Sequence, residues 1–161
     1  MWPGAVQIYI WQQKLHSTFP SMENRLPRRL DDYCRHFQID FFNLHLRCVF
    51  CNFYVNLQDL AAFFLKQLSL IWKDDQCYAC CNACVKHSAR YEAQLYCRCV
   101  VNSRNIESLL RLPLKDINIR CLVCYSLLDY LEKIDNICKG EELYLVRSTW
   151  RGYCRSCIRK V

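Results

Sequence analysis

The chain has 161 residues, of which 53% are apolar and 23% are charged, with 14 cysteines and a formal net charge of +7. This length is enough for one ordinary domain or for two small ones. No stretch approaches the roughly 18 uninterrupted apolar residues of a membrane span, so composition excludes a transmembrane helix and no membrane partner is expected.

Residues 1–21 show neither helical nor strand periodicity. Their short apolar run, from Val6 to Trp11, has no basic residue before it and is followed by Gln12 and Lys14, which makes a poor secretory signal. We therefore expect a disordered leader over residues 1–21, with Met22 as a second candidate start. We also expect a reducing compartment, where clustered cysteines hold metal more often than they form disulfides.

Residues 22–47 form an N-terminal arm that is rich in Arg and Phe. After the first cysteines, Asn56 precedes an apolar stripe at helical spacing, and Asp59 follows it by three residues as in a weak capping box. The run from Leu68 to Lys73 then has strand character. The sequence therefore predicts a helix and a strand between two groups of cysteines.

The next segment, 85–101, carries an apolar face at helical spacing and predicts a linker helix; the face consists of Val85, Ala89, Ala93, Tyr96 and Val100. A second short helix is expected after Asn105 and before Pro113, and Pro113 is expected to open another turn that leads to Arg120. The whole linker is taken as residues 85–120.

A further helix is predicted after Asp129. Glu132 follows this residue by three positions, which indicates a capping box, and Gly140 is placed to end the helix. The run from Leu143 to Arg147 then predicts a strand. The second half of the chain thus has the same order of elements as the first.

The cysteines explain this order, because they repeat with an offset of 73 residues. Each half reads CxxC, 29 intervening residues and CxxC, and the eight cysteines are Cys48, Cys51, Cys81, Cys84, Cys121, Cys124, Cys154 and Cys157. Two residues between cysteines let one turn present both sulfurs to a tetrahedral Zn²⁺ ion. The sequence therefore predicts two small α+β zinc-binding domains, 48–84 and 121–157, each with one structural Zn²⁺, followed by a tail over 158–161.

Zinc changes the meaning of the net charge. Eight thiolates add eight negative charges and two Zn²⁺ ions return four positive ones, so the formal charge falls from +7 to +3. This mild positive charge favours acidic partners but does not match the strongly basic surface of a dedicated DNA-binding domain.

Six cysteines lie outside the repeat and are interpreted as small buried or incidental thiols: Cys34, Cys77, Cys80, Cys97, Cys99 and Cys138. Cys77 and Cys80 form a CxxC of their own, but their counterparts 73 residues later are Trp150 and Tyr153, which cannot bind zinc. No histidine recurs at the repeat offset, and no spacing pairs a cysteine nucleophile with a base, so the chain is not expected to be an enzyme.

The doubled CxxC-x29-CxxC pattern with a helical linker resembles the papillomavirus early protein six oncoproteins over about residues 22–161. The segment Leu68-Ser69-Leu70-Ile71-Trp72-Lys73-Asp74 is similar to the segment before the second CxxC in cutaneous-type members. The segment Val146-Arg147-Ser148-Thr149-Trp150-Arg151-Gly152 is similar to the segment before the last CxxC in the family. The resemblance implies a viral adaptor in the host nucleus and cytoplasm. Such an adaptor would alter host transcription, apoptosis, innate immunity or ubiquitin-dependent turnover.

Members of this family hold an acidic LxxLL helix between the two zinc domains and the linker helix. The resemblance implies a Mastermind-like coactivator, paxillin or a ubiquitin ligase as the partner, and it maps the partner-binding positions to Phe50, Leu68, Ile71, Lys73, Arg120 and Arg147. Thr149 stands where mucosal members often have Arg, which favours the first two partners. Arg159 stands where a PDZ-binding tail needs Ser or Thr, so no PDZ partner is expected.

The alternative is a zinc-dependent nucleic-acid-binding regulator of transcription, because Tyr153 and Arg155 place an aromatic residue near a basic one. No recognition helix with clustered Arg or Lys supports it. Six basic residues are interpreted as solvated charges: Arg28, Arg29, Arg151, Arg155, Arg159 and Lys160. Weak binding of double-stranded DNA and a weak homodimer stay open. A RING-type ligase is disfavoured, because RING ligands interleave within one domain.

Overall fold

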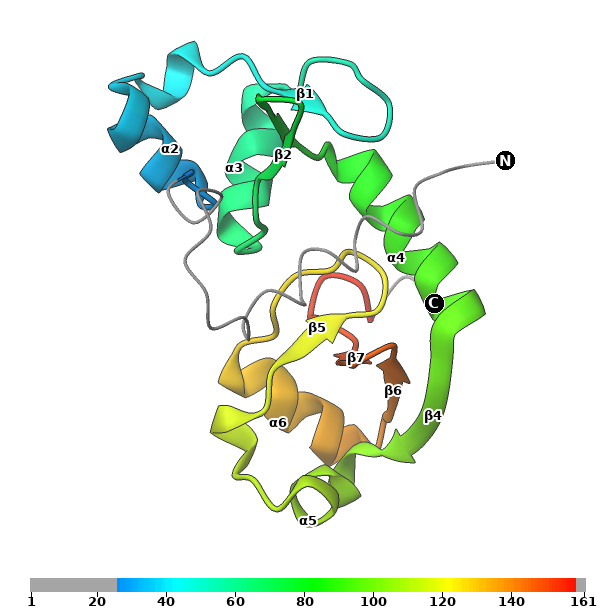
Figure 1. The fold of residues 1–161 in the computed structure, drawn as a ribbon. Coiled ribbons are helices and arrows are strands. Elements are labelled where there is room, and N and C mark those ends of the chain that lie inside the picture. The colour runs from blue at the N-terminus through cyan, green and yellow to red at the C-terminus, as the bar shows by residue number, and fades with distance from the viewer. Residues whose placement is uncertain (1–25, 159–161) are drawn as a thin grey trace, which may run out of the picture. The chain divides into compact units, whose positions relative to one another are not determined.

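The computed structural model describes residues 26–158, so the predicted leader at 1–21 and Arg159 in the tail lie outside the described residues. The described residues contain both helices and strands, and the predicted α+β class is confirmed (Figure 1). The chain divides into two compact units between Val85 and Lys86.

The first unit contains a three-stranded sheet and two helices before the start of the long helix α4. In chain order its elements are α2 (Leu30–Phe37), η3 (Phe41–Asn43), β1 (Arg47–Cys48), α3 (Leu57–Leu65), β2 (Ile71–Lys73) and β3 (Gln76–Ala79). The division between the units falls within the next helix, α4 (Asn82–Tyr96), most of which belongs to the second unit. The strand order is β1-β3-β2, with β1 parallel to β3 and β2 antiparallel to β3.

Helix α3 begins where the sequence predicted. The Asn56 side chain accepts a hydrogen bond from the backbone N–H of Asp59 at 2.8 Å, which satisfies one of the free amides of the first turn. Leu60 and Phe63 are buried on its inner face. The Asp59 carboxylate does not close a capping box and instead accepts from the backbone N–H of Asn82 at 3.1 Å.

Helix α2 lies in the arm, where sequence reasoning expected no element. Its rings of Tyr33 and Phe37 have centroids 6.1 and 6.2 Å from that of Trp72 on β2, whose indole N–H donates to the carbonyl of Pro27 at 2.8 Å. The spacing of Leu30, Tyr33, Cys34 and Phe37 is that of one helical face, and this signal could have predicted the helix.

The strand predicted over Leu68–Lys73 begins three residues too early. Strand β2 starts at Ile71, while Leu68 and Leu70 lie in a connection in which the N–H of Leu70 donates to the carbonyl of Arg28 at 2.7 Å. Both leucines are 5% exposed. Period-two alternation therefore does not apply to them, since they are buried without belonging to a strand.

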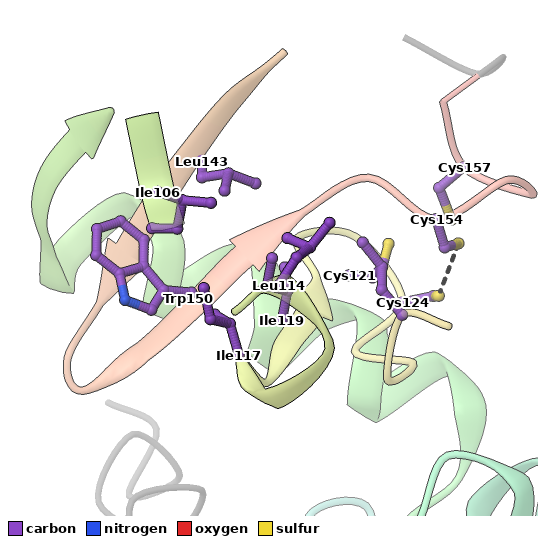
Figure 2. Close-up of a cluster of buried hydrophobic side chains, with 11 residues drawn as sticks. Ile106, Leu114, Ile117, Ile119, Cys121, Cys124, Leu143, Trp150, Cys154 and Cys157 are labelled. Atoms are coloured by element: carbon purple, nitrogen blue, oxygen red, sulfur yellow. Dashed lines mark hydrogen bonds between the residues drawn. The ribbon is translucent and has the colours of Figure 1, made fainter. Parts of the chain in front are cut away.

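The second unit contains a four-stranded sheet of order β4-β6-β7-β5. Its elements are β4 (Cys97–Asn102), η4 (Ser103–Asn105), α5 (Ile106–Leu110), η5 (Leu114–Asp116), β5 (Ile119–Cys121), α6 (Tyr130–Lys139), β6 (Glu142–Val146) and β7 (Thr149–Gly152). The short helix before Pro113 and the turn after it are confirmed as α5 and η5. Figure 2 shows the hydrophobic core of this unit, with Trp150 at one end and four cysteines at the other.

The capping box of α6 is confirmed. Asp129 accepts from the backbone N–H of Glu132 at 2.8 Å, and the Glu132 side chain accepts from the backbone N–H of Asp129 at 3.0 Å. Gly140 follows the helix with a φ of +67°, the left-handed conformation that glycine adopts without steric cost.

The predicted linker helix over 85–101 is wrong at its C-terminal end. Helix α4 ends at Tyr96, and the chain continues as β4, which pairs antiparallel with β6; Val100 lies opposite Tyr144. Val100 is 46% exposed and does not join a helical face. The β-branched pair Val100 and Val101 favours the extended conformation, and pairing with β6 satisfies the backbone.

Candidate metal centres

The structure brings the eight repeat cysteines together as two groups of four. One group is Cys48, Cys51, Cys81 and Cys84, and the other is Cys121, Cys124, Cys154 and Cys157. Within each group all four sulfur atoms lie within 4.8 Å of one another. Each group belongs to one compact unit, so the grouping follows the 73-residue repeat.

Equivalent backbone bonds place the first two sulfurs of each group. The carbonyl of Cys48 accepts from the N–H of Asn52 at 2.9 Å, and the carbonyl of Cys121 accepts from the N–H of Tyr125 at 3.1 Å. Asn52 and Tyr125 have φ of 61° and 65°, so the chain turns back sharply after the second cysteine. Cys48 and Cys121 then remain in strands β1 and β5.

In each unit, the first turn of a helix accepts a hydrogen bond from the backbone next to the other pair of ligand cysteines. Asp59 on α3 accepts from the N–H of Asn82, which follows Cys81, and Glu132 on α6 accepts from the N–H of Arg155 at 3.0 Å, which follows Cys154. These are equivalent positions of the repeat. The 29-residue interval therefore carries a helix whose first turn holds the returning pair of cysteines in place.

The spacing and chemistry of the four sulfur atoms in each group fit a Zn²⁺ ion. Four sulfurs at about 2.3 Å from one Zn²⁺ ion in a tetrahedron are about 3.8 Å apart. The Sγ atoms of Cys51 and Cys81 are 3.9 Å apart, and those of Cys124 and Cys154 are 3.7 Å apart (Figure 2). Four soft thiolates select Zn²⁺ among common ions, and they leave no coordination position for substrate, which is typical of a structural site.

One thiol in each group is acidified by its neighbours. Hydrogen bonding with Cys80 lowers the pKa of Cys48 to about 4, and hydrogen bonding with Cys121 and then with Ser126 lowers the pKa of Cys124 to about 4. Burial raises the pKa of Cys157 to about 12. Zinc binding to the second site must therefore displace a proton from Cys157.

The other six cysteines stay outside both groups, and all 14 are free thiols. Cys80 is buried and Cys77 is half-buried, so the CxxC that overlaps the repeat contributes no member to the first group. Cys97, Cys99 and Cys138 are exposed.

The predicted partner-binding residues of the first unit differ in exposure. Phe50 lies half-buried in the turn between Cys48 and Cys51, and Lys73 is exposed at the end of β2. Leu68 and Ile71 are 5% and 6% exposed. The role of these four residues in partner binding stays a prediction.

The two predicted arginines of the second unit belong to one network. Arg120 and Arg151 lie opposite each other on β5 and β7, and both guanidinium groups contact the ring of Tyr125, with centroid distances of 4.9 and 4.0 Å. Arg151 donates to one carboxylate oxygen of Glu92 at 3.1 Å, and Arg147 donates to the other at 3.3 Å. Arg147 also covers the ring of Tyr96 at 3.5 Å.

Sequence reasoning missed two members of this network. Arg151 was predicted to be a solvated charge, which is wrong: it is 1% exposed, and two of its nitrogens, Nε and Nη1, have no hydrogen-bond partner among the described residues. Glu92 on α4 was not singled out and is 2% exposed. Burial raises the pKa of the Glu92 carboxyl, while Arg151 and Arg147 oppose that change.

The sequence of this chain is similar to those of known proteins. The profile of the family described as Early Protein (E6) matches residues 48–157, which is the span of the two cysteine groups. The chain belongs to the E6 family. It is 48% identical to Protein E6 of Human papillomavirus 65 over 139 residues, which cover 86% of this chain and 99% of that protein.

Other E6 proteins are similar over the same extent. Identity to Protein E6 of Human papillomavirus type 60 is 46%, covering 86% of this chain and 97% of the relative, and identity to that of Human papillomavirus 47 is 35%, covering 91% and 94%. The resemblance to the E6 oncoproteins and the prediction of two zinc ions are thus confirmed. Among residues 26–158 no helix has the length and apolar character to cross a membrane.

Proposed function

We propose that this E6 protein is a zinc-dependent adaptor that binds acidic LxxLL helices of host proteins and acts without catalysis of its own. The observation that carries the proposal is the arginine network of the second unit. Arg120, Arg147 and Arg151 bring three positive charges to one place, next to the carboxylate of Glu92. A group of guanidinium charges of this kind suits an acidic peptide.

Apolar contact supplies most of the expected affinity. An amphipathic helix in a groove anchors through its i, i+3 and i+4 leucines, and each fully buried leucine contributes about 1.5 to 3 kcal/mol. Arg147 is 17% exposed, and Lys73 is exposed. A solvent-exposed ion pair with either residue would add only about 0.2 to 1 kcal/mol. We therefore expect the leucines to determine affinity and the basic residues to determine which peptide is chosen.

The partners proposed for this adaptor are a Mastermind-like coactivator, paxillin and a ubiquitin ligase. Its proposed compartments are the host nucleus and cytoplasm. Fourteen free thiols support a reducing compartment, because thiolate ligands persist there without oxidation to disulfides.

The test is fluorescence anisotropy of labelled LxxLL peptides from the three partners against the zinc-loaded protein. We expect binding in the micromolar range, abolished when the peptide leucines are replaced by alanine and weakened several-fold when its acidic residues become amides. Failure of all three peptides at tens of micromolar, or equal binding of the alanine peptides, would contradict the adaptor function.

Charge reversal in the protein gives a matched comparison. Arg120→Glu and Lys73→Glu should weaken binding of the acidic peptide and favour a basic version of it, whereas Lys115→Glu, at an exposed position outside the network, makes the same charge change and should have little effect. Leu68→Asp is a poor test, because Leu68 is 5% exposed and a buried carboxylate would destabilise the first unit itself.

Nucleic-acid binding is the alternative outcome. Contacts with phosphates release counterions, so DNA binding falls steeply as salt rises, whereas binding anchored by leucines changes little. If the protein binds labelled double-stranded DNA at 150 mM salt more tightly than any LxxLL peptide, the nucleic-acid-binding function replaces the adaptor function.

A further inference from the structure

A fifth thiol lies against the first zinc site. The Sγ atom of Cys80 is 4.0 Å from that of Cys48, which is close to the 3.9 Å between the ligand sulfurs of Cys51 and Cys81. Cys80 is 1% exposed and Cys48 is fully buried. Yet Cys80 does not join the group of four sulfurs, so it contacts a ligand without being placed as one.

The second zinc site has a comparable contact from a different residue. The hydroxyl oxygen of Ser126 lies 3.1 Å from the Sγ atom of Cys124. Ser126 corresponds to Phe53 in the repeat, and Cys80 corresponds to Tyr153, so neither contact is inherited from the shared pattern. Each unit therefore brings one hydrogen-bonding side chain to one of its ligand sulfurs, from a position that is not equivalent in the repeat.

The direction of both hydrogen bonds follows from the chemistry of the loaded site. In the structure the Cys48 thiol donates to Cys80, and the Cys80 thiol donates to the carbonyl of Cys81 at 3.5 Å. A zinc-bound Cys48 is a thiolate and has no proton to give, so in the loaded site Cys80 must become the donor, and Ser126 must be the donor to Cys124. The Cys80 proton then turns from the carbonyl to Cys48, because a charged thiolate is the stronger acceptor. Four thiolates around one Zn²⁺ carry a net charge of −2, and a buried charge is stable only where donors compensate it.

We propose that Cys80 and Ser126 are positioning residues for zinc, each donating a hydrogen bond to one zinc-bound sulfur and so strengthening zinc retention in its own unit. Comparable partners of metal ligands change metal affinity by about tenfold to a hundredfold when they are removed. The proposal rests on the two zinc sites alone and is independent of what the protein binds.

The test uses the full-length, zinc-loaded protein and measures zinc transfer to a competing chelator. Cys80→Ala should lower the affinity for one of the two zinc ions by about tenfold and leave the affinity for the other unchanged. Ser126→Ala should lower the affinity for the other ion instead. Cys80→Ser, which keeps a donor of similar size, should recover most of the loss. The matched controls Cys77→Ala and Ser148→Ala remove a thiol and a hydroxyl that do not contact the ligand sulfurs. They should not change the affinity for either zinc ion.

Cobalt substitution supplies a readout that a packing defect would not change. Loss of a donor should shift the sulfur-to-cobalt charge-transfer band of the variant while its tetrahedral ligand-field bands stay in place. Unshifted bands with wild-type affinity in both alanine variants would overturn the proposal. It would equally be overturned if Cys80→Ala held only one metal ion at saturating zinc, since Cys80 would then be a ligand.

Discussion

At the scale of single residues, Glu92 is the most consequential side chain outside the zinc ligands. It is 2% exposed and hydrogen-bonds Arg151, which is equally buried, and Arg147. The electrostatic attraction within the network roughly offsets the free-energy cost of desolvating its charges, so the intact network stabilises the fold only weakly. Removal of the Glu92 carboxylate has a much larger effect, because Nε and Nη1 of Arg151 have no hydrogen-bond partner within residues 26–158, and Arg151 would then lose its carboxylate as well.

We therefore predict that Glu92→Gln lowers the free energy of unfolding of the second unit by about 3 to 5 kcal/mol, because it leaves Arg151 buried without a counter-charge. Urea denaturation of the zinc-loaded protein would measure this. The double variant Glu92→Leu with Arg151→Met should recover much of the loss. Asp31→Asn, at the exposed pair with Arg29, should leave stability unchanged and serves as the control. A Glu92→Gln protein as stable as the original would contradict this role of the network.

At the scale of elements, the helix after each first pair of cysteines links the sequence repeat to the zinc sites. Asn56 and Asp129 cap equivalent helices, and the third residue of each helix, Asp59 or Glu132, bonds the N–H beside the returning cysteines. A loss of the cap should therefore reduce the stability of the unit to which the helix belongs.

We predict that Asn56→Ala and Asp129→Ala each cost about 0.5 to 2 kcal/mol of unfolding free energy, because each leaves a backbone N–H of the first helical turn without its acceptor. Asp129→Asn keeps an acceptor and should cost less. Urea denaturation followed by circular dichroism measures the difference. The prediction fails if the alanine and asparagine variants at position 129 are equally stable.

Local signals predicted these elements well, because a cap residue, an apolar stripe and a glycine act within a few residues of one another. The same signals failed where distant pairing decides the conformation. Val100 continues a helical pattern but pairs with Tyr144 in a sheet. Leu68 has strand character but lies in a connection whose backbone bonds reach Arg28. The hairpin between β2 and β3 turns at Asp74 and Asp75, which both have positive φ without being glycine.

The same difference between local and distant signals separates the zinc sites from the network around Glu92. The zinc ligands could be predicted because the metal imposes a spacing that the sequence repeats. The network around Glu92 could not, because it joins α4 to β7 and to the turn before β7, more than 50 residues away, and no spacing marks a buried ion pair. The one signal in the sequence was Glu92 itself, an acidic residue at helical spacing from Val85 and Ala89 and so on the apolar face of α4.

At the scale of the whole molecule, the chain consists of two small units that each depend on one metal ion. Structural zinc contributes about 10 to 16 kcal/mol in small zinc-binding peptides, as much as the total stability of a typical domain. Both units bury apolar side chains, and the hydrophobic cluster of the second unit includes its four ligand cysteines. Removal of zinc should therefore unfold both units rather than loosen them.

Native mass spectrometry of the purified protein and of two cysteine variants tests this account most directly. The original chain should carry two Zn²⁺ ions, and Cys51→Ala and Cys124→Ala should each carry one, with circular dichroism showing loss of structure in part of the chain only. Replacement of all six cysteines outside the two groups by serine should leave two ions bound. The account would be contradicted if that serine variant bound fewer than two zinc ions, or if either alanine variant still bound two.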